Sequence, residues 1–212
     1  MGNILIEKNE PLTTGEKKLF GYFGEGAKIR PPFRILNPQN IFIGDKTSIR
    51  ENAFIHAYKD LSELLNYVKP EFKNYYTKEN YLYNGRIEIG REVQIGRFLL
   101  MSSTYLIRLE DHVLLSERVF VGDNNHTFSH PFIPIIQQPN KVGNPIHLGK
   151  GTWIGVGSAI LSGTKLGVNS IVGANSIVEG EFPSHAVIGS EKAKLLFRRF
   201  DEKSLKEFVE KS

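Results

Sequence analysis

The side chains of this chain that are best suited to moving a proton near neutral pH are its histidines. Six are present: His56, His112, His126, His130, His147 and His185. Two of them lie in one polar run that extends from Asp123 to Pro131. An imidazole titrates near pH ~6.5, so it can accept a proton from an attacking group and return it to a leaving group. Cysteine is absent, so no thiol is available to carry an acyl group.

The elements that must position these histidines are indicated by a repeat of six residues between Leu148 and Pro183. Aliphatic residues occupy one position of each repeat: Leu148, Ile154, Ile160, Leu166, Val172 and Val178. A small hydroxyl residue stands four places after each of the first five: Thr152, Ser158, Thr164, Ser170 and Ser176. Six is a multiple of the strand period of two, so one residue of each repeat can face inward on every strand. Hexapeptide periods are typical of parallel β-helices.

The same period is present earlier in the chain, with interruptions. Its aliphatic positions are Ile43, Ile49, Ile55, Ile89, Ile95, Met101, Leu109, Leu115 and Val121. We therefore predict an all-β protein with a parallel β-helix over residues 35–190, interrupted by insertions at about 58–86 and 124–145. Residues 1–34 are expected to form an N-terminal extension, and residues 191–212 a C-terminal helix.

The first insertion carries a helical pattern followed by tyrosines. The residues spaced as on one helix face are Leu61, Leu64, Leu65 and Val68, with Asp60 as a plausible N-cap and Pro70 as a stop. The tyrosines are Tyr75, Tyr76, Tyr81 and Tyr83. They either cover the side of the β-helix or stack on a sugar ring, and we favour covering because aromatic residues mostly serve packing.

The run from Gly151 to Ile160, continued from Gly167 to Val178, resembles the hexapeptide-repeat acyltransferases, in particular the sugar and polysaccharide O-acetyltransferases. The resemblance implies a left-handed parallel β-helix and a homotrimer with acetyl-CoA and the acceptor in clefts between subunits. It further implies transfer of an acetyl group from acetyl-CoA to a hydroxyl of a sugar, in the biosynthesis of a surface polysaccharide such as capsule or O-antigen.

The same family places a histidine in the loop that corresponds to residues 124–145, followed by aromatic residues, a proline and Ile-Pro-Ile, as at Ile133 to Ile135. The resemblance thus implies that His126 is the general base. Asp123 then orients its ring or holds an acceptor hydroxyl, and an acceptor site is expected at Asn124, Asn125 and His130. Asn124 stands where many relatives have a first histidine. His130 has an equally good structural interpretation, as the cap of the turn before Pro131.

For acetyl-CoA the family uses the edge of the last coils. By position the expected contacts are Trp153, Val156, Gly157, Gly173 and Ala174, where small residues let a ligand approach the backbone. Trp153 fits ordinary packing equally well. Phosphate contacts are expected from Lys192, Lys194 or Arg198, although acidic neighbours such as Glu191 also fit a solvated surface of mixed charge.

Composition limits the remaining classes of function. The chain has 212 residues, 40% of them hydrophobic, and a formal net charge of +4. We find no apolar segment long enough to span a membrane and no secretory signal. The lack of cysteine fits a reducing compartment, so a cytoplasmic protein is expected. No basic stripe interleaved with aromatic residues suggests a nucleic-acid partner.

Three alternatives stay open at the level of sequence. One is N-acetylation of an amino group on a nucleotide-linked sugar. A second is a metal-dependent hydratase like the γ-class carbonic anhydrases, which requires three histidines around zinc. His126 and His130 have no third histidine with a matching motif, so we expect no metal. The third is a β-helix without catalytic activity that serves as an interaction scaffold.

Overall fold

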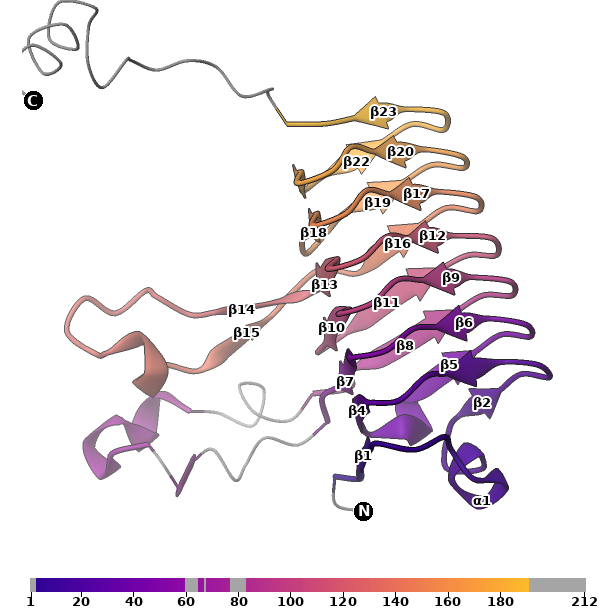
Figure 1. Cartoon of the computed structure of the whole chain (residues 1–212). Helices are drawn as coiled ribbons and strands as arrows, with labels where there is room; N and C mark the ends of the chain where they lie inside the picture. The colour runs from indigo at the N-terminus through magenta and orange to yellow at the C-terminus, as the bar shows by residue number, and fades with distance from the viewer. Residues whose placement is uncertain (1–2, 60–64, 67, 77–82, 191–212) are drawn as a thin grey trace, which may run out of the picture.

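The computed structural model describes residues 3–59, 65–66, 68–76 and 83–190, and in these the chain winds into a three-sided prism (Figure 1). Sheet A contains β1 (Leu5–Lys8), β4 (Phe33–Leu36), β7 (Ala53–Ala57), β10 (Leu100–Ser103), β13 (Phe120–Gly122), β18 (Ala159–Ile160) and β21 (Ile177–Val178). Sheet B contains β2 (Tyr22–Phe23), β5 (Ile41–Ile43), β8 (Arg86–Ile89), β11 (Leu106–Leu109), β16 (Ile146–Leu148), β19 (Lys165–Leu166) and β22 (Glu181–Phe182). Sheet C contains β3 (Lys28–Ile29), β6 (Ser48–Ile49), β9 (Gln94–Ile95), β12 (Leu114–Leu115), β17 (Trp153–Ile154), β20 (Ile171–Val172) and β23 (Val187–Ile188).

Each coil visits sheets B, C and A in turn, and equivalent strands of successive coils pair in parallel. The chain therefore forms a parallel β-helix, as the hexapeptide pattern predicts, and the helix is left-handed, as the resemblance to the acyltransferases implies. Three edges result, which we name by the sheets they join in chain order: the B–C edge, the C–A edge and the A–B edge. The only antiparallel pairing within the three sheets of the described chain is that of β1 with β4.

The interior is a stack of aliphatic side chains. The repeat positions predicted to face inward are buried, with Ile154, Ile160 and Val172 wholly so. The hydroxyl residues of the repeat are buried as well, at the edges. Ser158 Oγ donates to the carbonyl oxygen of Gly173 on the next coil at 2.9 Å, and Ser170 Oγ to that of Pro183 at 3.1 Å. These side chains bond carbonyl groups at the corners, which would otherwise lack partners inside the protein.

The N-terminal segment closes the first coil. Helix α1 (Thr14–Lys17) begins with a capping box in which the side chains of Thr13 and Glu16 bond each other's backbone N–H groups. Leu12 and Phe20, which flank this helix, belong to the same apolar core as the coil interior. Strands β2 and β3 already pair with the second coil, so the prism begins inside the range that we assigned to an N-terminal extension.

The coil is interrupted twice at the A–B edge, between β7 and β8 and between β13 and β16. In the first interruption Pro70 begins the 3-10 helix η3 (Pro70–Tyr75). Proline suits a first helical position because the missing N–H would be unpaired there anyway. Asp60, Leu61, Leu64 and the expected C-terminal helix at 191–212 lie outside the described residues. In the described part no helix is long and apolar enough to cross a membrane.

Two valines on neighbouring strands of sheet C test the inward positions. Val172→Ala removes two methyl groups from a buried site and should lower the free energy of unfolding by about 2 kcal/mol, from lost burial and the cavity left behind. Val187→Ala, at a side chain that is 80% exposed, should change it by less than about 0.5 kcal/mol. Denaturant unfolding at one protein concentration measures both, and equal effects would contradict the assigned faces.

Candidate active site

The polar run that contains His126 forms an arm. Strand β14 (Asn124–His126) pairs antiparallel with β15 (Asn140–Val142), and the 3-10 helix η5 (Ile135–Gln137) lies between them. Figure 1 shows this hairpin extending from the A–B edge well beyond the prism. A two-stranded ribbon is marginally stable by itself, so the arm needs support at its root and its tip.

The root of the arm is anchored to the coil below it by Asp123. This residue is fully buried, and its carboxylate accepts hydrogen bonds from the hydroxyl of Ser103 at 2.7 Å, from the backbone of Thr104 at 2.7 Å and from that of Tyr105 at 3.1 Å. The Thr104 hydroxyl adds a fourth at 3.1 Å. No hydrogen bond links the carboxylate to the ring of His126 within the described structure, so Asp123 acts here as an anchor of the backbone and not as an orienting group.

Two further contacts complete the root. The Asn124 amide donates to the hydroxyl of Ser102 at 2.8 Å, so this side chain also points at the prism and not toward an acceptor. On the returning strand, the backbone of Asn144 donates to Ser162 Oγ at 2.7 Å, on the coil above. A Cβ atom at Gly143 would overlap the carbonyl oxygen of Asp123, so only glycine fits where the two strands of the root cross.

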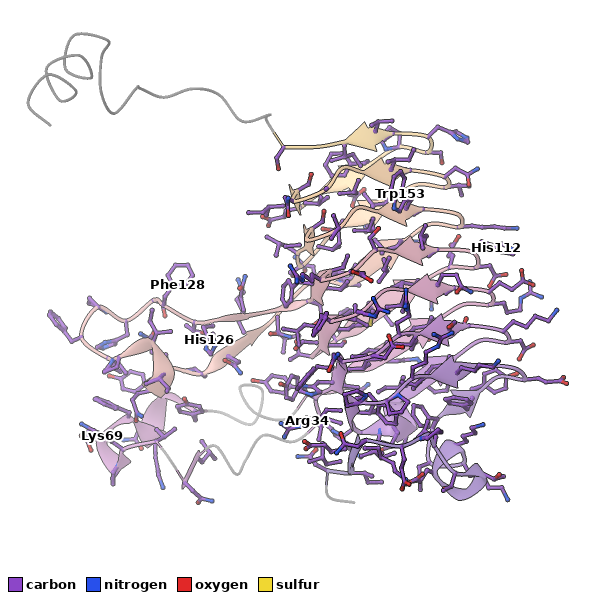
Figure 2. All side chains as sticks on the ribbon, in the orientation of Figure 1. Arg34, Lys69, His112, His126, Phe128 and Trp153 are labelled. Atoms are coloured by element: carbon purple, nitrogen blue, oxygen red, sulfur yellow. The ribbon has the colours of Figure 1, made fainter. Side chains whose placement is uncertain are left out.

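His126 itself is exposed at the end of β14, opposite Asn140 in the hairpin register. Figure 2 shows its side chain on the arm, away from the prism. Asn125 is also exposed, opposite Lys141. The imidazole is therefore accessible to a substrate or to a second protein chain. The side chains of Asp123 and Asn124, in contrast, are bonded to the prism.

His130 supports the tip of the arm. Its Nδ1 accepts a hydrogen bond from the backbone of Phe132 at 3.3 Å across the turn, as the structural interpretation of the sequence predicts. The buried Gln138 fixes the same turn, because its amide nitrogen donates to the carbonyl oxygens of Ile133 at 2.7 Å and His130 at 3.1 Å. No sequence pattern singles out Gln138, because the turn that it closes becomes apparent only in the folded arm.

The first insertion holds the arm from below. The backbone N–H of Lys69 donates to Gln137 Oε1 at 2.8 Å, and the ring of Tyr75 meets His130 edge to face at 5.3 Å. Tyr83 is buried, and burial raises its pKa to about 12. The burial of Tyr83 agrees with the favoured covering role, whereas Tyr75 is half exposed and contacts the arm instead of the coil, and Tyr81 lies outside the described residues.

His56 lies near the arm root on sheet A. Its Nδ1 is 3.3 Å from the hydroxyl of Tyr58, and its ring meets Phe54 edge to face. Burial, and secondarily the positive charge of Arg34, lowers the pKa of His56 below its ordinary value. Its strand neighbour in register is Ser102, the partner of Asn124. The other ring nitrogen of His56, Nε2, is buried and has no hydrogen-bond partner among the described residues.

The residues expected to bind acetyl-CoA lie together at the C–A edge. Trp153 is 46% exposed on sheet C and donates its indole N–H to Ser116 Oγ at 3.0 Å. Val156 and Gly157 form the next corner, and Gly173 and Ala174 form the same corner one coil later. The backbone N–H of Asn175 bonds the carbonyl of Val156 at 2.8 Å, which joins the two corners. Lys192, Lys194 and Arg198 lie outside the described residues.

The described parts of the two halves of the expected site do not meet within one chain. The arm leaves the A–B edge, whereas the five residues expected to bind the donor lie at or beside the C–A edge. Figure 2 shows Trp153 on the prism and His126 out on the arm. Sheet A separates these edges, and its outer face carries a row of residues paired in register, with Phe54, Leu100 and Ile177 exposed. Within the described residues, no group of three histidine or carboxylate side chains is placed to hold a metal ion.

Comparison with known proteins finds the same fold in solved acyltransferases. No family model matches the chain. It is 27% identical over 169 residues to the probable acetyltransferase Rv3034c of Mycobacterium tuberculosis. The match covers 79% of this chain but 54% of that protein, so the chain spans about half of its relative.

Among solved structures the chain is similar to AntD, an N-acyltransferase from Bacillus cereus in complex with dTDP and coenzyme A. The TM-score is 0.62 at 22% identity, and the match covers 97% of this chain and 100% of AntD. It is also similar to the hexapeptide-repeat acetyltransferase VCA0836 from Vibrio cholerae, complexed with acetyl coenzyme A, with a TM-score of 0.50, 22% identity, and coverage of 91% and 81%. These likenesses establish the fold.

Asp123→Asn tests the anchoring role. The amide keeps the size of the side chain but directs an N–H group at backbone donors, so the free energy of unfolding should fall by about 1.5–3 kcal/mol. Asp111→Asn is the control at a partly exposed corner, where the carboxylate accepts from the guanidinium of Arg91 at 2.7 Å and from one backbone N–H at 2.8 Å, and it should cost less than about 1 kcal/mol. Unchanged stability with lost catalytic turnover would instead make Asp123 a catalytic residue.

Proposed function

We propose that this protein is an acetyltransferase that moves the acetyl group of acetyl-CoA to a sugar, with His126 as the general base. The observation that carries the proposal is the exposed imidazole of His126 on an arm that is braced at both ends. A loop that served only to connect two coils would need neither the buried Asp123 at its root nor the buried Gln138 at its tip. The likeness to a probable acetyltransferase supports the reaction type.

The chemistry follows from the imidazole. A sugar hydroxyl is a poor nucleophile at neutral pH, so Nδ1 or Nε2 of His126 takes its proton as the oxygen attacks the thioester carbonyl. The tetrahedral intermediate collapses, the carbon–sulfur bond breaks, and the same proton passes to the thiolate of CoA. The products are an acetyl ester and CoA. Because the chain has no cysteine, transfer is direct within a complex of both substrates and passes through no acyl-cysteine.

The site is composed of two subunits in this proposal, which calls for an oligomer, and a homotrimer fits a three-sided prism. The arm at the A–B edge of one copy would extend toward the C–A edge of the next, where Trp153, Val156, Gly157, Gly173 and Ala174 accept the pantetheine chain. The exposed apolar row of sheet A lies between these edges and suits burial against a neighbour. Lys192, Lys194 and Arg198 stay candidates for the phosphate groups of the donor.

The acceptor atom is either oxygen or nitrogen. The motif around His126 resembles that of O-acetyltransferases. In favour of nitrogen, a second structure of AntD, with a TM-score of 0.61, holds dTDP-4-amino-4,6-dideoxyglucose and coenzyme A. An amino group on a nucleotide-linked sugar is therefore our second candidate, with an amide as the product. Paired assays with one sugar that carries either a hydroxyl or an amine at the same carbon separate the two, with release of CoA thiol as the signal.

His126→Ala should leave folding and CoA binding intact while lowering turnover by about 10²–10⁴-fold, the usual contribution of a general base. The control is His112→Asn, which removes another exposed imidazole, at the B–C edge. This control should keep the turnover of the parent protein. Near-native turnover of His126→Ala, measured as CoA release under saturating substrates, would refute the assignment.

Mixing two inactive variants tests the shared site. Gly173→Leu adds bulk at the donor edge without backbone overlap, because a Cβ atom there meets its nearest neighbour at 3.5 Å. His126→Ala and Gly173→Leu should each be inactive alone. Random mixed trimers should recover about a quarter of the parental activity, since one in four seams joins an intact arm to an intact edge. Recovery of no activity, with mixed trimers verified by mass, would place both halves in one subunit.

A further inference from the structure

The C–A edge has two parts with different chemistry. From Gly155 onward its corners carry mostly small or aliphatic residues, and four of these, Val156, Gly157, Gly173 and Ala174, are expected to bind the donor. Toward the N-terminus the same edge carries one arginine in each of four successive coils: Arg30, Arg50, Arg97 and Arg118. We name these four the arginine ladder. The two parts are continuous, because the backbone of Gly157 bonds the carbonyl of Glu117 at 3.0 Å.

The arginine ladder has more positive charge than its neighbours neutralise. Two glutamates stand on the same corners, and the arginines share them. Arg97 lies 3.0 Å from Glu51 and 3.4 Å from Glu117, while Arg50 and Arg30 approach Glu51 at 3.6 and 3.7 Å. Four arginines against two glutamates leave an excess of two positive charges. Arg118 forms no ion pair with any described residue, and its guanidinium lies 6.0 Å from the centre of the Phe98 ring.

Phe98 and Arg118 adopt a backbone conformation that disfavours large side chains. Their φ angles are +60° and +58°. On the same edge the equivalent left-handed positions of other coils hold Asn52, Gly157 and Asn175, the residue types that tolerate this conformation best. The Phe98 side chain is 51% exposed, so packing does not account for it. Phe98 and Arg118 thus present large side chains at corners where the other coils of this edge hold asparagine or glycine.

We propose that the arginine ladder, with Phe98, binds the diphosphate of a nucleoside diphosphate ester. Guanidinium groups match phosphate oxygens in a bidentate geometry, and an exposed aromatic ring beside them suits a nucleobase. Both substrates of the proposed function can supply this group, since CoA and a nucleotide-linked sugar each contain a nucleoside diphosphate. The inference rests on the proposed function for the choice of these two ligands, but the binding that it predicts is measured without turnover.

Arg118→Asn and Phe98→Asn test the proposal, because asparagine already occupies two equivalent corners of this edge. Each variant should unfold at the same temperature as the parent protein or higher. Isothermal titration with CoA and with dTDP should show at least about a tenfold loss of affinity for the ligand that uses the ladder. Pantetheine, which has no phosphate, should bind each variant as it binds the parent. The control is His112→Asn, a left-handed position with φ +61° on the B–C edge, which should leave all affinities unchanged.

The pattern of losses identifies the source of the diphosphate. Weaker binding of CoA alone assigns the ladder to the donor, and weaker binding of dTDP alone assigns it to a nucleotide-linked acceptor. Unchanged affinity for both ligands in both variants would overturn the proposal, as would a parent protein that binds neither ligand. If the ladder binds a ligand but no acetyl transfer occurs with any sugar, the proposed function fails and this inference stands.

Discussion

The structure depends on one constraint, which is that every coil must satisfy the backbone polar groups of the next. The strands do so along three sheets with the same register in successive coils. At the corners, where strand pairing stops, buried hydroxyl groups such as those of Thr164 and Ser158 donate to carbonyl groups of the following coil. Unpaired polar groups inside a protein are costly, so these positions tolerate little change. The chain can leave this arrangement only where a corner opens outward, and in this protein it does so twice, at the A–B edge.

This constraint also explains why the sequence was informative about the fold. A buried aliphatic residue and a buried hydroxyl recur together because each coil repeats the geometry of the last, so the run from Leu148 to Val178 predicts strands, corners and inward faces correctly. The earliest coil was missed because Tyr22–Phe23 and Lys28–Ile29 show no repeated hexapeptide before them. Their strands are recognisable only through pairing with residues about 20 positions later.

The candidate site was less predictable, because a sequence shows the type of each residue but not the direction in which its side chain points. Asp123 and Asn124 are polar residues beside a histidine, which suits catalysis, yet both side chains turn back toward the prism and bond residues 102–105. A sequence motif does not reveal which side of a hairpin root a side chain occupies. Likewise, the arginines of the C–A edge are far apart in sequence and share one edge of the prism only because the coils stack. The structure therefore separates Asp123 and Asn124 from the histidine that follows them in sequence, and it brings arginines that are distant in sequence to one edge.

The contact between the two excursions has a wider consequence. Lys69 and Tyr75 of the first insertion contact Gln137 and His130 of the second. One coil lies between the two insertions, and at the A–B edge that coil has only a short corner at residues 104–105. The two insertions therefore form one unit outside the prism, which is connected to the prism in two places. Lengthening or replacing one of them in the course of divergence would deprive the other of its support. New specificity in such a protein should arise through coordinated replacement of both segments, while the prism stays as it is.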